Sequence, residues 1–105
     1  MTGLLLNPKA TNNIKKLLFR SLDLLQRKSN KENQIDGFLG EGLPKGTKLW
    51  SKAGLMSEAR HDATWFITPN RKIMMIIVFC KGNALSRDNL LLPAFASELS
   101  KWCTQ

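Results

Sequence analysis

A lysine and a glycine, two residues apart, lie near the middle of the chain in the stretch Lys48-Leu-Trp-Ser-Lys-Ala-Gly54. The residues before them alternate in polarity like a β-strand, which predicts that a strand carries Lys52 and Gly54 to its end. The ammonium group would supply a positive charge, and the glycine would leave room for a ligand against the backbone. A second charged cluster, Arg60-His61-Asp62, follows after a short turn. By spacing alone, the pattern favours a solvated lysine at a strand end over a residue that holds an anion.

The cluster after the turn does not form a catalytic pair by itself. Adjacent residues of a strand point to opposite faces, so His61 and Asp62 cannot contact each other as a base and its orienting acid. We therefore expect structural roles for both. Arg60 is a candidate for an auxiliary anion contact, because a guanidinium group binds carboxylates in a bidentate manner.

Other chemistries find little support in the sequence. The glycines from Gly40 to Gly46 match neither a dinucleotide-binding nor a phosphate-binding loop, and no set of residues has the spacing of a metal site. We expect no metal and no cofactor. Cys80 and Cys103 are too few for a disulfide framework, and buried or incidental thiols are favoured over a bridge or a Cys80–His61 nucleophile pair.

Three further segments resemble a known family: Gln34-Ile-Asp-Gly-Phe-Leu-Gly-Glu-Gly-Leu-Pro44, Ala59-Arg-His-Asp-Ala63 and Ile77-Val-Phe79. With the lysine–glycine strand they resemble the C-terminal part of the class A β-lactamase-like serine hydrolases, which include penicillin-binding proteins, over nearly all 105 residues. The family pattern is lysine, Thr or Ser, then glycine. Here the middle position is Ala53.

The resemblance implies roles for particular residues. Lys52 would hold the substrate carboxylate, Gly54 would be the open position, and the backbone N–H of Leu55 would donate to the oxyanion hole. Ala53 cannot donate the family's hydroxyl hydrogen bond, which is worth about 1.5–3 kcal/mol. Carboxylate recognition would fall roughly ten- to a hundredfold unless another donor compensates, the candidates being Ser51, Ser57 and Arg60. β-Lactam hydrolysis is thus in doubt, while related acyl transfer to amides or esters stays open.

The nucleophile of the family is not among the serines of this chain. None of the seven is followed three residues later by lysine, and no Ser-Asp-Asn element is present. The resemblance places Ser-x-x-Lys upstream, so we expect a C-terminal fragment of a serine hydrolase that is inactive alone. The sequence contains no signal peptide or membrane-spanning segment, whereas relatives are usually periplasmic or secreted.

The elements expected to position these residues form one partial α+β domain over residues 1–105. A helix is predicted over 8–28, from Asn7-Pro8 onward, with Ile14, Leu17, Leu18, Leu22 and Leu25 on one face. A glycine-rich connection over 29–46 should cover Phe38 and Leu39. Three antiparallel strands follow within 47–80 (Thr47–Lys52, Asp62–Thr68 and Ile73–Phe79). The last helix is predicted over 86–103, capped by Ser86 or Asp88, with a kink or a later start at Pro93.

The third strand, Ile73–Phe79, is a continuous apolar run, which predicts a central strand covered on both faces. Its order in the chain, however, provides a partner on one side only. An unpaired apolar edge is a feature that natural sheets avoid. We therefore expect more chain, or a protein partner, at the edge of Ile73–Phe79.

The net charge of +8 suggests an alternative of another class, a non-catalytic basic binding module. No motif for nucleic acid accompanies the charge, and nothing in the sequence suggests a membrane partner. The two functions predict different surfaces. A hydrolase segment should place Lys52 and Leu55 along an open groove, whereas a binding module should gather its basic residues on one face (Lys15, Lys16, Arg27, Lys45 and Arg71).

Overall fold

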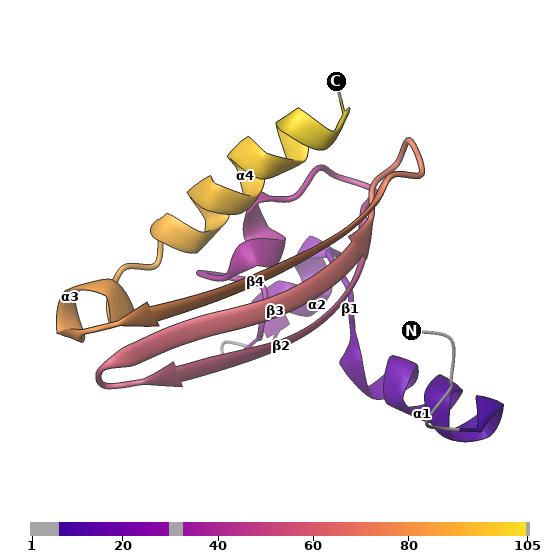
Figure 1. Ribbon diagram of the computed structural model, residues 1–105, viewed down its shortest axis with the longest axis horizontal. Coiled ribbons are helices and arrows are strands. Elements are labelled where there is room, and N and C mark those ends of the chain that lie inside the picture. The colour runs from indigo at the N-terminus through magenta and orange to yellow at the C-terminus, as the bar shows by residue number, and fades with distance from the viewer. Residues whose placement is uncertain (1–6, 30–32, 105) are drawn as a thin grey trace.

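The computed structural model describes residues 7–29 and 33–104, without the side chains of residues 24, 25, 103 and 104. The predictions for Leu25 and Cys103 lie outside these described side chains. The protein has α+β architecture, as predicted, with an antiparallel sheet in the order β1-β2-β3-β4 (Figure 1). The elements are α1 (Pro8–Leu18), β1 (Phe19–Arg20), α2 (Leu24–Ser29), the 3-10 helix η1 (Leu39–Gly42), β2 (Lys48–Met56), β3 (Ala59–Ile67), β4 (Ile73–Lys81), α3 (Asn83–Ser86) and α4 (Leu91–Thr104).

The three predicted strands are confirmed as β2, β3 and β4, each nine residues long. Tight turns join them. The turn at Pro69–Asn70 is closed by the hydroxyl of Thr68, which accepts a hydrogen bond from the Lys72 N–H at 2.9 Å. All three strands are longer than predicted, because residues in and beside the turns continue the ladder.

The single helix predicted over 8–28 is wrong. The helix begins as expected, with the Asn7 side chain accepting from the Ala10 N–H at 2.8 Å. It ends at Leu18, where Phe19 becomes extended and pairs with Trp50 of β2. Pairing with a strand about thirty residues away in the sequence overrides local helical preference, which no local pattern reveals. The apolar face of α1 is also not buried, since Leu17 is 75% exposed.

The final helix begins later than residue 86. A short helix, α3, occupies Asn83–Ser86, and α4 begins at Leu91. The carboxylate of Asp88 accepts hydrogen bonds from the N–H groups of Leu90 and Leu91, at 2.9 and 3.1 Å. Pro93 therefore lies in the first turn of α4, where a missing N–H costs nothing. Of the two predicted outcomes for Pro93, the later start is the one observed.

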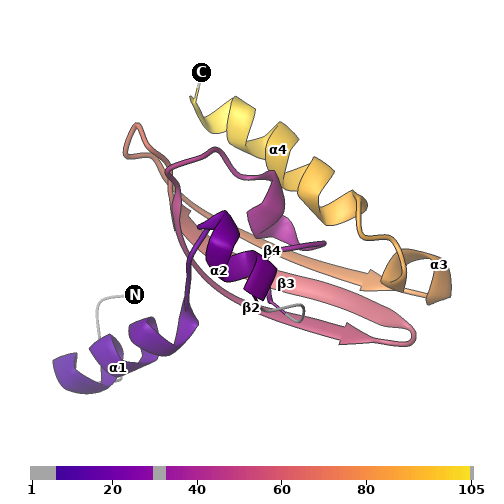
Figure 2. The ribbon, with the colours of Figure 1, turned by 180° about the vertical axis from the view of Figure 1, so that it is seen from behind.

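The core lies on one face of the sheet, between β2–β4 and the layer of α4 and η1. Leu39 of η1 and Leu92 of α4 are almost fully buried, and they pack with Leu49 and Phe66 of the sheet. Phe38 is also buried, as predicted for the glycine-rich connection. Figure 2 shows α2 and the η1 segment in front of the strands, with α1 set apart at the side. The fold is thus layered on one side only.

The opposite face of the sheet, here called the open face, carries the alternate residues of β2, β3 and β4. The burial of β4 shows the asymmetry: Ile76 and Cys80 are buried, whereas Ile77 and Phe79 are 55% and 77% exposed. The prediction that this strand is covered on both faces is therefore wrong for the described residues. The free edge is as expected, since no described strand pairs with the outer edge of β4. The apolar run thus leaves alternate side chains of β4 exposed on the open face.

Candidate functional site

Lys52 lies in the middle of β2 and not at its end, because the strand continues to Met56. Its side chain is exposed on the open face, and its ammonium group donates to the carbonyl of Ala53. The residues opposite it in the sheet are Ala63 and then Ile77. Lys52 is thus a positive charge whose cross-strand neighbours are apolar.

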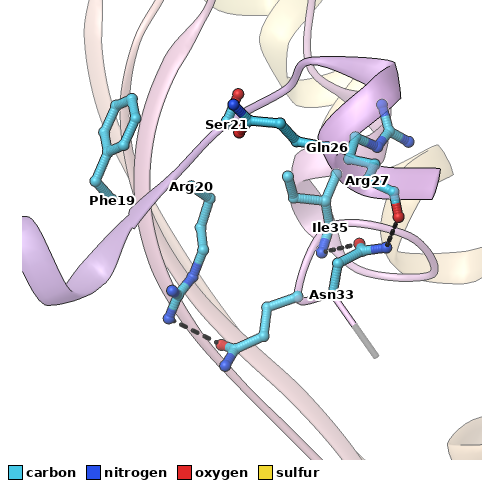
Figure 3. A pocket seen from close by; sticks show the side chains of 8 residues that line it. Phe19, Arg20, Ser21, Gln26, Arg27, Asn33 and Ile35 are labelled. Carbon is cyan, nitrogen blue, oxygen red and sulfur yellow. Dashed lines mark hydrogen bonds between the residues drawn. The ribbon is translucent and has the colours of Figure 1, made fainter. Parts of the chain in front are cut away.

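The outer edge of β2 is only partly paired. β1 reaches no further than Trp50, and two side chains continue the pairing beyond it. An Arg20 guanidinium nitrogen donates to the Ser51 carbonyl at 3.0 Å, and the Ala53 N–H donates to the Gln34 side-chain oxygen at 2.8 Å. Figure 3 shows Arg20 in this region, and a guanidinium nitrogen of Arg20 donates to the Gln34 side-chain oxygen at 3.3 Å. Side chains here take the place of a neighbouring strand.

The backbone N–H of Leu55 points toward the same outer edge. Successive N–H groups alternate in direction along an antiparallel strand, so residues two apart point the same way. Because the Ala53 N–H turns away from β3 to Gln34, the Leu55 N–H also turns away from β3. The donor predicted for an oxyanion hole therefore lies at the edge of β2, about 10 Å along the strand from Lys52.

The room expected at Gly54 is partly filled by His61, its neighbour across the β2–β3 pair. A Cβ atom at Gly54 would lie 3.1 Å from the His61 ring. The same ring packs against Phe79, with the ring centroids 5.2 Å apart. His61 therefore joins β2 to β4 on the open face, which is compatible with the structural role predicted for it.

Arg60 and Asp62 lie on the opposite, core-facing side of β3, as the alternation requires. Arg60 is 7% exposed, and it donates to the Gly37 carbonyl at 2.7 Å and to the Ser86 carbonyl at 2.9 Å. Its guanidinium group also stacks over Phe38. These contacts join β3 to the segments at Gly37–Phe38 and at Ser86, so at least two Arg60 nitrogens stabilise the fold.

Removing the Arg60 guanidinium is expected to destabilise the protein. Arg60→Met would leave two buried carbonyls without donors, at a cost of about 3 kcal/mol in the free energy of unfolding. Arg87→Met, at an exposed arginine, should change that free energy by less than about 0.5 kcal/mol. Urea unfolding measures both. Equal stability of the two variants would show that the Arg60 hydrogen bonds contribute nothing.

Asp62 is a buried acid beneath the sheet. One carboxylate oxygen accepts the Leu39 N–H at 3.0 Å and thereby holds η1 against β3. Burial raises the pKa of Asp62 from 3.8 to about 6, while the Leu39 hydrogen bond opposes that shift. Hydrogen bonds with Thr64 and Ala63 also lower the pKa of Asp62, and the hydroxyl of Ser51 on the same face is buried with no hydrogen-bond partner among the described residues.

The structure separates the predicted site residues into two groups. Lys52 borders a groove of about 350 Å³ between α1 and the open face, with Trp50, Trp65 and Met75. Ala53, Leu55 and Arg60 instead border a cavity of about 650 Å³ beside Gly37 and Gln34. β2 separates the two cavities. Its Lys52 side chain faces one of them, and its Leu55 N–H lies at the edge of the strand.

Two residues of this region were not predicted from the sequence. Arg20 fell inside the expected long helix, and Gln34, at the start of a segment that resembles the family, was assigned no role at the site. Their role depends on contacts with Ser51 and Ala53 that are distant in the sequence. The hydroxyls considered as substitutes for a Thr at position 53 are less suited: Ser51 is 2% exposed on the core side, and Ser57 lies in the β2–β3 turn.

Within residues 7–29 and 33–104, no three His, Cys, Asp or Glu side chains gather as metal ligands would. The described helices are also too short or too polar to cross a membrane. Cys80 is a buried free thiol.

Comparison with known proteins places this geometry in a family. The model of the Beta-lactamase enzyme family matches residues 3–104. No curated protein matches the chain. Solved structures do: PBP-A as an acyl-enzyme complex with penicillin G matches with a TM-score of 0.71 and 17% identity, over 96% of this chain and 34% of that one.

Two class A enzymes are similar in the same way. A β-lactamase from Xanthomonas campestris pv. campestris has a TM-score of 0.68 and 21% identity, over 95% of this chain and 34% of that one. An ancestral class A β-lactamase has a TM-score of 0.67 and 17% identity, over 92% and 34%. This chain thus spans about a third of the length of these structures, and at such identities they show the fold alone. The match of the family model over nearly all residues establishes that the chain belongs to the Beta-lactamase enzyme family, in agreement with the resemblance to its C-terminal part.

Proposed function

We propose that this chain forms the C-terminal wall of an acyl-transfer pocket in a β-lactamase-like serine hydrolase. The proposal rests on the geometry at the edge of β2. The Leu55 N–H points away from β3 at this edge, two residues beyond the Ala53 N–H that donates to Gln34. The Lys52 side chain is exposed on the open face. A donor directed at an edge can bind a developing oxyanion, and a nearby ammonium group can hold a substrate carboxylate. Gly54 lies between them, and Ala53 contributes no hydroxyl. The substrate class is a β-lactam or a related amide or ester.

The attacking group must come from another part of the enzyme. None of the seven serines has a lysine three residues later. The free edge of β4 at Ile73–Phe79 is a surface on which the nucleophile-bearing part, or a separate protein, would add a strand. Arg60 remains a predicted auxiliary contact, since it borders the same cavity as Leu55.

The chain alone is expected to be inactive toward nitrocefin, a chromogenic cephalosporin, because acyl transfer needs a nucleophile that it does not carry. The measurement is the change in absorbance with purified protein and with Lys52→Ala. Turnover by the wild-type chain that Lys52→Ala abolishes would contradict the inactivity that we propose.

Adding the remaining part tests the pocket itself. The part of PBP-A that this chain does not match, co-expressed with the chain, should be acylated by a fluorescent penicillin. Acylation should fall at least tenfold with Lys52→Ala and should be unchanged with Lys101→Ala, at an exposed lysine of α4. Equal acylation with both variants would exclude a role of Lys52 in binding the substrate.

The alternative is a non-catalytic basic binding module, which the net charge of +8 supports. Against it, Arg27 is paired with Asp36, and the other basic candidates lie on different elements: Lys15 and Lys16 on α1, and Lys45 and Arg71 in turns. Binding of an anionic polymer that weakens steeply as salt rises would favour this module.

A further inference from the structure

Two charged side chains of β3 hold the segment that contains η1, here called the wall segment (Gly37–Gly42). Arg60 donates to the Gly37 carbonyl at 2.7 Å, and Asp62 accepts the Leu39 N–H at 3.0 Å. Residues two apart on the strand thus bind residues two apart in the segment. These hydrogen bonds join the backbone of the wall segment to side chains of β3, where a paired strand would use backbone groups.

The wall segment borders the cavity of about 650 Å³ that lies beside the edge of β2. Phe38 and Glu41 line the cavity from this segment, and Leu55 lines it from β2. The far end of the segment is fixed, because Gly42 lies against the Pro93 backbone of α4. The near end depends instead on the hydrogen bonds with β3. The position of that end therefore sets the width of the cavity beside the Leu55 N–H.

Asp62 holds the wall segment with a carboxyl group that no cation contacts among the described residues. The side chain is 1% exposed, and its hydrogen-bond partners are the Leu39 N–H, Thr64 and the Ala63 backbone, which are all uncharged. Neither ion pair of the described residues includes it. An ionised carboxylate in this place has lost its hydration without gaining a counter-ion, which is costly. The protonated group is neutral and fits the same place.

The titratable groups packed around Asp62 leave its charge uncompensated. Burial raises its pKa most strongly, and the charge of Arg20 on β1 lowers it least. Arg60 of β3 is engaged by two backbone carbonyls. Glu41 of the wall segment is itself an acid, and it accepts a backbone N–H of the same segment at 2.7 Å. The core-facing residues of β2 and β4 and the described buried residues of α4 are uncharged, and Cys80 is the titratable one among them.

Loss of the Asp62 proton therefore favours conformations in which water reaches the carboxylate. Burial raises the pKa of Asp62 from 3.8 to about 6 in the closed structure. Between these values the closed structure keeps the proton, whereas a structure with a hydrated carboxyl group releases it. The ratio of open to closed molecules then rises with pH by up to about a hundredfold, and it levels off above pH 6.

We propose that proton loss from Asp62 releases the Leu39 end of the wall segment and opens the cavity beside the Leu55 N–H as the solution becomes neutral. The proton passes to water, and water hydrates the carboxylate. Because the Leu39 side chain is 0% exposed, the opening is infrequent at any pH, and the pH changes how often it occurs. This inference rests on the proposed function in treating the cavity as a substrate site, whereas the motion itself is independent of it.

Amide hydrogen exchange of the full chain, followed by NMR at increasing urea concentrations, measures the opening. Local opening exposes little surface, so exchange of the Leu39 amide should be nearly independent of urea. Phe66 is the reference, because its strand is paired on both sides and its exchange reports global unfolding. After correction for the intrinsic pH dependence of exchange, we expect Leu39 to open at least about tenfold more often at pH 7 than at pH 4.

Two matched variants show whether Asp62 is the titrating group. Asp62→Asn removes the proton and keeps an oxygen that can accept the Leu39 N–H. In this variant the opening of Leu39 should change by less than about twofold between pH 4 and pH 7. Asp36→Asn makes the same change at a carboxylate whose side chain is 51% exposed, and it should keep the wild-type dependence on pH.

The outcomes separate the motion from the reaction. If Leu39 had the same urea dependence as Phe66 at both pH values, the segment would open only when the protein unfolds, and the inference would be overturned. It would also be overturned by an opening that does not change with pH in the wild type, or that changes equally in Asp62→Asn. A pH-dependent opening without acylation in the co-expression experiment would support the motion and overturn the proposed function.

Discussion

Gly42→Ala is expected to cost at least about 3 kcal/mol in the free energy of unfolding. A Cβ atom at Gly42 would lie 1.8 Å from the Pro93 carbonyl oxygen and 2.7 Å from its carbon. Both are backbone atoms in the first turn of α4, so no side chain can move aside. Either η1 or α4 must shift, which exposes Leu39 and Leu92, now 0% and 1% exposed. Thermal and urea unfolding measure the loss.

Gly40→Ala is the matched control within the same short helix. Its Cβ would lie 3.2 Å from a methyl group of Leu49, the end of a side chain that can adjust. The expected loss is about 1 kcal/mol. If the two variants were equally stable, the close approach of η1 to the α4 backbone would not be a determinant of the fold.

Asp62 is expected to make the folded state less stable as the pH rises. Below pH 3.8 the carboxyl group is protonated in both states, whereas between pH 3.8 and about 6 the unfolded chain loses the proton first. The folded state then binds more protons, so stability declines across this range and levels off above it. A shift of about two pKa units corresponds to about 3 kcal/mol. The measurement is the free energy of unfolding against pH, as the difference between wild type and Asp62→Asn.

The asparagine variant keeps an oxygen that can accept the Leu39 N–H. The pH dependence of the difference between wild type and Asp62→Asn therefore reports the titration of Asp62. Asp36→Asn is the control of opposite sign, because the hydrogen bond from Arg27, together with one from Asn33, lowers the pKa of Asp36. Stability from Asp36 should be present at neutral pH and lost as the pH falls below its usual pKa. A difference between wild type and Asp62→Asn that is flat from pH 4 to 7 would show that Asp62 does not titrate within the fold.

Local sequence patterns were sufficient to predict the three long strands. Runs of β-branched and aromatic residues between turn residues predicted β2, β3 and β4, and the same pattern placed His61 and Asp62 on opposite faces. Alternation, however, only divides residues into two sets. Which set is buried depends on the face against which α4 and η1 pack, and that is a contact across the chain.

The same limit applies at the site and in the helices. Arg60 stays a predicted auxiliary contact, but no local pattern reveals that carbonyls from positions 37 and 86 occupy two of its nitrogens. The helix predicted over 8–28 is interrupted where Phe19 and Arg20 join β2. In both cases a partner distant in the sequence outweighs the local preference.

The sequence by itself determined the family, the three long strands, the alternation that puts Lys52 and Asp62 on opposite faces, and the lack of a lysine three residues after any serine. These follow from residue order and the period of a strand. Only the tertiary structure decided that Lys52 stands exposed on an apolar sheet face, that Arg20 and Gln34 occupy part of the β2 edge, and that Asp62 is buried under η1. Each depends on packing between distant segments, because burial and hydrogen-bond partners are properties of the assembled layers.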